Sequence, residues 1–132
     1  TLALALTPSA PGLLAERAMA SLALDRPGEA LDDLERAVAG DPSAAEAWVL
    51  RASALRRLDR IAPAAESVAQ ALRLEPENVE AMLERGIIRQ IQGDAAGARA
   101  DWERVIELAP DSSAADLAAQ NMALIEAGPA RR

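Results

Sequence analysis

The sequence predicts an all-α solenoid built of helix-turn-helix repeats. Four prolines follow one another at intervals of 34 residues: Pro8, Pro42, Pro76 and Pro110. Between them the apolar residues recur at helical spacing and do not alternate as in a strand. The composition is 51% hydrophobic, mostly Ala and Leu with no Phe or Tyr, which favours helix over strand. A fixed period of this length indicates a repeat architecture.

The same offset relates residues other than proline, so the period is not an accident of proline placement. Each related set falls on the apolar stripe of a predicted helix. The related sets are Ala30, Ala64 and Ala98; Leu34, Val68 and Trp102; Ala37, Ala71 and Val105; Trp48 and Met82; Ala52 and Gly86. We therefore expect these positions to form a repeating core.

Each period holds two helical stretches, one before and one after a turn. The turns are expected at Asp25-Arg26-Pro27-Gly28, Asp59-Arg60 and Gly93-Asp94. Each proline follows the second helix and ends it, because proline lacks an N–H and clashes with the preceding turn. The helices are predicted at residues 11–24, 28–40, 44–58, 61–74, 78–92, 95–108 and 113–126.

Three helix starts carry capping signals. Ser43 and Glu46 have the spacing of a capping box, Asn78 is a favourable N-cap, and Ser113 precedes Asp116 in the same way. We expect each of these polar side chains to accept a backbone N–H of its helix.

This arrangement resembles the tetratricopeptide repeat, with its pattern W-x2-L-G-x2-Y, then A-x3-F, then P. Residues 45–76 carry the pattern with Trp48, Ala52, Leu55, Ala64, Val68 and Pro76. Residues 79–110 follow with Met82, Gly86, Ala98, Trp102 and Pro110, and residues 11–42 with Leu14, Ala18, Ala30, Leu34 and Pro42. The resemblance implies a right-handed α-solenoid of three full repeats and a C-terminal capping helix.

The expected organisation is the end of a truncated preceding repeat at 1–10, repeats at 11–44, 45–78 and 79–112, a capping helix at 113–127 and a tail at 128–132. Because Pro8 is in phase, Leu2 to Leu6 are interpreted as the last turn of an earlier repeat, and the chain as cut from a longer array. Asp116, Gln120 and Ala123 would make the outer face of the last helix polar, as a solenoid cap requires.

Arg17, Arg51 and Arg85 stand where the family pattern has Leu. One interpretation is that each arginine lays its stem on the helix and keeps its guanidinium in water. The other is that these arginines pair with acids of second helices, such as Asp33 and Asp101. We favour the first interpretation, because surface ion pairs contribute little.

Charge and residue inventory argue against several functions. The net charge is -7, with 21 acids against 14 bases, which disfavours nucleic acid as a partner. The sequence has no His, Cys, Tyr or Lys, so the usual catalytic bases and nucleophiles are missing. We expect no enzymatic activity, no catalytic residue, no cofactor and no metal, and we interpret the pairs Glu80/Glu84 and Glu103/Glu107 as solvated faces.

No apolar run approaches the roughly 18 residues that suggest a membrane span, so we expect a soluble chain without membrane insertion. The compartment stays open between the cytoplasm and a bacterial periplasm.

The resemblance implies a concave surface, lined by the first helix of each repeat, that holds a peptide or a helix. Most residues expected on this strip are apolar, although the core of each repeat does not require them, which suggests a binding site. Packing of helix against helix along the concave wall is the alternative. The expected groove residues are Ala15, Met19, Leu22, Val49, Ser53, Arg56, Arg57, Leu83, Ile87, Gln90, Ile91, Leu117, Asn121 and Leu124.

Family members that hold the acidic tails of chaperones do so with Lys and Asn side chains. The matching places here hold Ala15, Met19, Leu50, Glu80 and Glu84, so we do not expect that activity.

The sequence thus predicts a protein-protein interaction module that binds a protein or peptide segment. The alternatives are a structural spacer or self-association region of a larger protein, or the non-catalytic part of an enzyme. A weak homodimer through the N-terminal end, near Leu13 and Leu14, is a further expectation.

Overall fold

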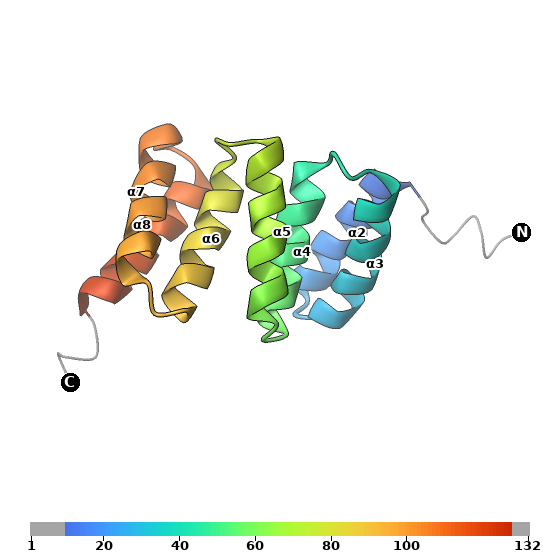
Figure 1. Cartoon of the computed structure of the whole chain (residues 1–132), viewed down its shortest axis with the longest axis horizontal. Helices are drawn as coiled ribbons and strands as arrows, with labels where there is room; N and C mark the ends of the chain where they lie inside the picture. Colours follow the sequence, from blue (N-terminus) through green and yellow to red (C-terminus); the bar gives the residue numbers. More distant parts are fainter. Residues whose placement is uncertain (1–9, 128–132) are drawn as a thin grey trace, which may run out of the picture. The chain divides into compact units, whose positions relative to one another are not determined.

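The computed structural model describes residues 10–127, which form seven α-helices and, within that range, no strand. The helices, labelled in Figure 1, are α2 (Pro11–Ala23), α3 (Pro27–Gly40), α4 (Ala45–Arg57), α5 (Ile61–Leu74), α6 (Val79–Ile91), α7 (Ala95–Leu108) and α8 (Ser113–Ala127). Every predicted helix is present, and each boundary agrees with its prediction to within one residue. The expected earlier repeat at Leu2 to Leu6 and the tail at 128–132 lie outside the described residues.

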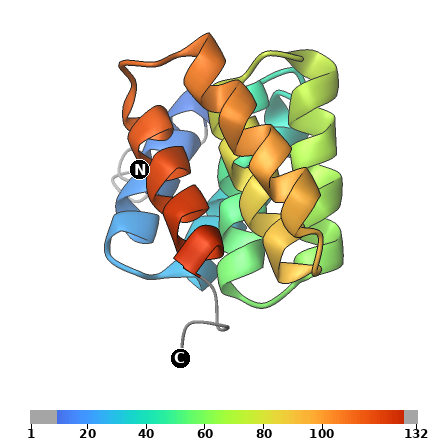
Figure 2. The same ribbon diagram turned by 90° about the vertical axis from the view of Figure 1, so that its left-hand side faces the viewer.

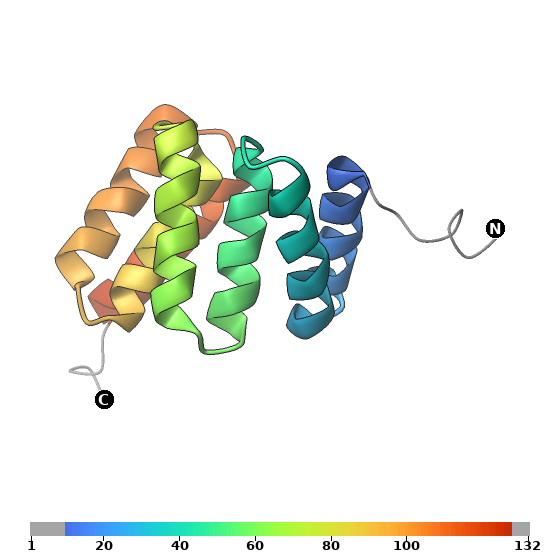
Figure 3. The ribbon, with the colours of Figure 1, turned by 45° about the vertical axis from the view of Figure 1, so that its right-hand side comes forward.

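The chain divides into two compact units, Thr1–Leu74 and Glu75–Arg132. In unit 1, α2 packs against α3, α3 against α4, and α4 against α5 (Figure 3). In unit 2, α6 packs against α7 and α7 against α8 (Figure 2). Each unit is described by itself below.

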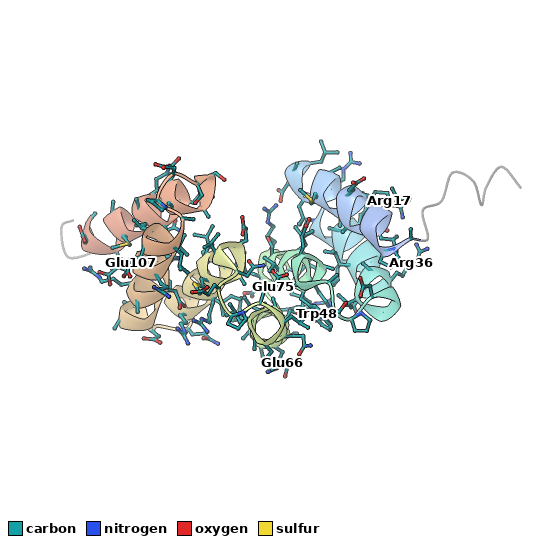
Figure 4. All side chains as sticks on the ribbon, turned by 90° about the horizontal axis from the view of Figure 1, so that it is seen from above. Arg17, Arg36, Trp48, Glu66, Glu75 and Glu107 are labelled. Carbon is teal, nitrogen blue, oxygen red and sulfur yellow. The ribbon has the colours of Figure 1, made fainter. Side chains whose placement is uncertain are left out.

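The core consists of the residues that the period relates. Those buried are Leu14, Ala18, Ala30, Leu34, Ala37, Ala52, Ala64, Val68, Ala71, Met82, Gly86, Ala98, Trp102 and Val105. Trp48 is only half-buried. Its indole Nε1–H donates to the Pro42 carbonyl at 2.9 Å, and the Arg51 guanidinium lies 5.8 Å from the ring centroid. This tryptophan, labelled in Figure 4, therefore ties the start of α4 to the proline before it.

The three predicted turns share one conformation. Asp25, Asp59 and Gly93, each 34 residues apart, have φ values of 56°, 62° and 88°. The N–H of the next residue reaches back to a carbonyl one turn inside the helix at 2.8 Å in every case: Arg26 to Ser21, Arg60 to Leu55, and Asp94 to Arg89. This is the Schellman arrangement that ends a helix at a left-handed residue.

Of the three predicted caps, only Asn78 is confirmed. Its side chain accepts the Ala81 N–H at 2.9 Å. The prediction for Ser43 is wrong, because Asp41 takes its hydroxyl at 2.6 Å and α4 begins without a side-chain cap.

The cap predicted at Ser113 is shifted by one residue. Ser112 accepts the Ala115 N–H at 3.0 Å, and Ser113 is already the first residue of α8. Both errors arise where a second polar residue lies nearby: Asp41 binds the Ser43 hydroxyl, and Ser112 provides the acceptor in place of Ser113.

The interpretation that placed Arg17, Arg51 and Arg85 with their guanidinium groups in water is wrong. Arg17 binds Asp33 through two hydrogen bonds of 2.6 and 2.8 Å, and the Asp33 side chain is only 7% exposed. Arg85 binds Asp101 at 2.7 Å, and Asp101 is 5% exposed. A buried carboxylate needs a cation, so these pairs differ from mobile surface ion pairs.

These bonds form a series that we call the 16-residue clip: an arginine of the first helix donates to the residue 16 positions later in the second helix. In the middle repeat Arg51 donates to the Ser67 hydroxyl and pairs with Glu35 of the preceding helix. The hydrogen bond to Asp33, and then its charge, raise the pKa of Arg17 above its ordinary value. Each repeat thus joins its two helices by a polar contact as well as by the core.

Candidate functional site

Unit 2 contains a cleft of about 200 Å³ among α6, α7 and α8. It is lined by Ile87, Gln90, Ile91, Trp102, Asn121, Leu124 and Ile125, none of which carries a charge. Trp102 is only 2% exposed and forms the floor. Ile91 is 51% exposed and Leu124 is 72% exposed, so large apolar side chains stand at the mouth.

Gly86 explains how an indole reaches this position. A Cβ at residue 86 would overlap the Trp102 ring, so only glycine lets the ring lie against the backbone of α6. The Trp102 Nε1–H donates to the Leu83 carbonyl at 3.2 Å and fixes the ring there. The corresponding pairs in the other repeats are Ala18 with Leu34, and Ala52 with Val68. In each repeat a small residue of the first helix thus stands opposite a larger residue of the second helix, and the smallest, Gly86, stands opposite the largest, Trp102.

The last helix leaves the cleft open. The buried residues of α8 are Ala114, Ala115 and Ala118, all in its first half. From residue 119 to 127 every residue is half-buried or exposed. Asp116, Gln120 and Ala123 are exposed, where the sequence placed the polar outer face. Small side chains therefore hold the start of α8 in place, and its second half presents larger apolar side chains to solvent.

The structure brings five of the predicted groove residues together around this cleft: Ile87, Gln90, Ile91, Asn121 and Leu124. Two others lie nearby in unit 2. Leu83 is half-buried and provides the carbonyl that holds Trp102, while Leu117 is exposed on α8 without lining the cleft.

Sequence reasoning missed Trp102 and Ile125 as cleft residues. Trp102 was assigned to the core by its period, and it belongs to both because the buried indole is also part of the cleft lining. Ile125 lies one helical turn after Asn121, so helical spacing alone could have added it to the strip.

In unit 1 the predicted groove residues do not gather in the same way. Leu22 and Val49 are buried and pack between helices. Ala15, Ser53 and Arg56 are half-buried, and Met19 is exposed. The Arg57 Nη1–H donates at 2.8 Å to the Leu22 carbonyl near the end of α2. Arg57 therefore caps the C-terminal end of α2, because an arginine side chain can donate to the last free carbonyls of a helix. The sequence did not predict this contact.

A second, polar cleft of about 410 Å³ in unit 1 is lined by Arg17, Ser21, Glu29, Asp32, Asp33 and Arg36. Figure 4 shows Arg17 and Arg36 on the same flank of the α2–α3 pair. Arg17 and Asp33 already neutralise one another in the 16-residue clip. Its lining is a mixture of both signs of charge, and it holds none of the predicted groove residues.

The remaining chemistry of the described residues is sparse. Between residues 10 and 127 no three acidic, His or Cys side chains converge as metal ligands would. None of the helices in that range has the length and apolar content to cross a bilayer. At the places where a carboxylate clamp would need Lys or Asn, Glu80 is exposed and Glu84 is buried, so the interpretation of this pair as a solvated face is wrong for Glu84.

Comparison with solved structures gives close agreement in fold. The first tetratricopeptide repeat domain of the human RPAP3 protein has a TM-score of 0.77 at 26% identity, over 89% of this chain and 92% of that one. The first domain of Spaghetti (RPAP3), solved with an HSP90 peptide, has a TM-score of 0.76 at 26% identity, over 92% and 98%. YrrB, described as having an unusual peptide-binding site, has a TM-score of 0.77 at 21% identity, over 92% of this chain and 61% of that one.

No curated protein gives a significant sequence match. The model of the tetratricopeptide repeat family matches residues 15–71 and 52–113, which together span most of the sequence. With seven helices between residues 10 and 127, a 34-residue period and these structural neighbours, the chain belongs to the tetratricopeptide repeat family and has its all-α helical repeat fold.

Proposed function

We propose that this chain is a protein-interaction module that binds a peptide or helix through the cleft of unit 2 and the apolar side chains around it. The observation that carries the proposal is the exposure of Ile91, Leu117 and Leu124 beside a cleft floored by Trp102. Because these side chains are already partly buried, covering one of them in a complex contributes about 1–2 kcal/mol. Apolar side chains gathered around a concave site are typical of a binding surface.

The related structures support peptide binding as the type of function. The Spaghetti domain was solved with a peptide of HSP90. That peptide carries three acidic residues, whereas this chain has a net charge of -7 and an exposed Glu80 where a clamp would need a base. We therefore propose a ligand other than an acidic chaperone tail.

The test is selection of binding peptides from a random peptide library against the full chain, followed by calorimetric titration of a selected peptide. Ile87→Asp should weaken binding at least about tenfold, because a charge would enter an apolar cleft. The matched control is Ala100→Asp, which adds the same charge at an exposed position of α7 outside the cleft.

Circular dichroism of Ile87→Asp should stay close to that of the parent chain. Trp102→Ala is the comparison for loss of core, with an expected cost of about 3–5 kcal/mol. If Ile87→Asp unfolds the chain as severely as Trp102→Ala, or if Ala100→Asp weakens binding equally, the assignment of the site is wrong.

Self-association is a second candidate, favoured by one observation in unit 1. Leu13 is 53% exposed, whereas Ala47, its equivalent one repeat later, is buried in the packing of α4 on α2 and α3. Leu24, at the other end of α2, is exposed as well. These side chains could meet those of a second copy, as two equal surfaces related by a twofold axis.

A further inference from the structure

We propose that the cleft of unit 2 receives one uncharged apolar side chain of an extended peptide, whose neighbouring peptide groups hydrogen-bond to the amides of Gln90 and Asn121. This inference rests on the proposed function and specifies the chemistry of its ligand. Four features of the cleft carry it: volume, lack of charge, aromatic floor and two side-chain amides.

The volume argues for a single side chain. Sites for small molecules and cofactors enclose about 300–1,000 Å³. The cleft has about 200 Å³, which is equivalent to about seven water molecules at roughly 30 Å³ each. A single branched aliphatic side chain fits within this volume, whereas a nucleotide or a whole amphipathic helix does not.

The lining argues for an apolar occupant without charge. Trp102 forms the floor, and Ile87 and Ile125 are half-buried in the walls. No lining residue is charged, so an ionised side chain would lose water and find no counter-ion. An apolar side chain would instead release water from the exposed parts of Ile91 and Leu124.

The amides argue for an extended main chain. Gln90 is exposed near the end of α6 and Asn121 is half-buried on α8, so the two reach the cleft from different helices. Each amide both donates and accepts, which matches the N–H and C=O of a peptide group. In a bound helix these groups are already paired within the helix, whereas an extended segment leaves them free for its binding site.

The experiment is a titration of the ¹⁵N-labelled full chain followed by NMR, with N-acetyl-leucine methylamide as the probe. This molecule is one apolar side chain between two peptide groups. We expect shifts at the Trp102 indole N–H and at the side-chain amides of Gln90 and Asn121, with a Kd on the order of 1 mM for so small a ligand. N-acetyl-glycine methylamide, which lacks the side chain, should produce no shift.

Isoamyl alcohol separates the two parts of the site, because it has the branched chain without peptide groups. It should shift the Trp102 indole as the leucine probe does, but should shift the two amides less than that probe, because one hydroxyl stands in place of two peptide groups. Asn121→Leu should weaken the leucine probe about five- to tenfold but should not weaken the alcohol, because the substitution keeps the cleft lining uncharged and apolar. The matched control is Gln120→Leu, one residue away on the exposed outer face of α8.

Four results would overturn the inference: no shift at Trp102, equal binding of the glycine probe, no effect of Asn121→Leu, or shifts produced by diluting the protein alone. The last would show that a second copy occupies the cleft. If a selected peptide loses affinity in Ile87→Asp while the leucine probe fails, the proposed function stands and this inference falls. If no peptide can be selected but the probe binds as described, the proposed function fails separately.

Discussion

Gly86→Ala tests the packing that creates the cleft. The added Cβ would overlap the Trp102 indole, and the ring has little freedom because it is buried and bonded to the Leu83 carbonyl. Alanine in place of glycine inside a helix would by itself stabilise by about 1 kcal/mol. Overpacking costs about 1–3 kcal/mol, and loss of the indole hydrogen bond costs about 1 kcal/mol. The net expectation is a loss of about 1–3 kcal/mol in the free energy of unfolding.

The assay is urea unfolding followed by far-ultraviolet circular dichroism, with the melting temperature as a second measure. Each kcal/mol should lower the melting temperature by about 3–5 °C for a chain of this size. The double variant Gly86→Ala with Trp102→Leu recreates the Ala18 and Leu34 pair of the first repeat. It should be more stable than the two single losses predict, with a coupling free energy of about 1 kcal/mol or more.

The control is Ala52→Gly at the equivalent position of α4, where a glycine has no indole to accommodate and should cost about 1 kcal/mol. The reasoning would be refuted if Gly86→Ala were as stable as the parent chain, or if the effects in the double variant were additive.

Three further predictions concern the clips, the turns and the N-terminal end. Replacing both Arg85 and Arg89 by Leu should cost about 2–4 kcal/mol in urea unfolding, because Asp101 would stay buried without a cation. Arg104→Leu, which breaks an exposed pair, should cost at most about 0.5 kcal/mol, and equal losses would refute the distinction between buried and exposed pairs. Because Asp59 and Gly93 both have a left-handed backbone, Asp59→Gly should stabilise the folded chain by about 0.5 kcal/mol and Gly93→Ala should destabilise it by about 1 kcal/mol. Opposite signs in thermal melts would contradict this. Sedimentation over a wide concentration range should show weak self-association that Leu13→Glu removes, and a strict monomer, or a dimer unaffected by the substitution, would exclude the N-terminal interface.

The period was sufficient to predict the fold. Residues such as Ala30, Ala64 and Ala98 have the same environment in each repeat, so a residue type repeated at fixed spacing reports directly on burial. Helix ends were predictable for a similar reason, because left-handed residues and prolines act on the backbone locally. The choice of capping side chain between neighbouring polar residues was not predictable. Asp41 binds the hydroxyl of Ser43, and Ser112 caps α8 in place of Ser113.

The candidate site was predictable only in part. Helical spacing places Ile87, Gln90 and Asn121 on one strip, but the cleft is also lined by Trp102, which its period assigned to the core. The prediction that Arg17, Arg51 and Arg85 keep their guanidinium groups in water was wrong for an energetic reason. The weak energy of exposed ion pairs does not apply to Arg17 and Arg85, because their carboxylate partners are buried and stand 16 residues later in the first and third repeats.

The 16-residue clip bears on how such a chain can be rearranged by duplication or by design. The clip that joins Arg17 to Asp33 uses residues of one repeat only, so copying that repeat copies its polar contact intact. Arg51 is different, because it donates to Ser67 in its own repeat and forms an ion pair with Glu35 in the repeat before. A transplanted copy of the middle repeat would lose its charged partner unless its new neighbour supplied an acid at the position of Glu35. The first repeat is portable in this respect, and the middle repeat depends on the order in which the repeats are joined.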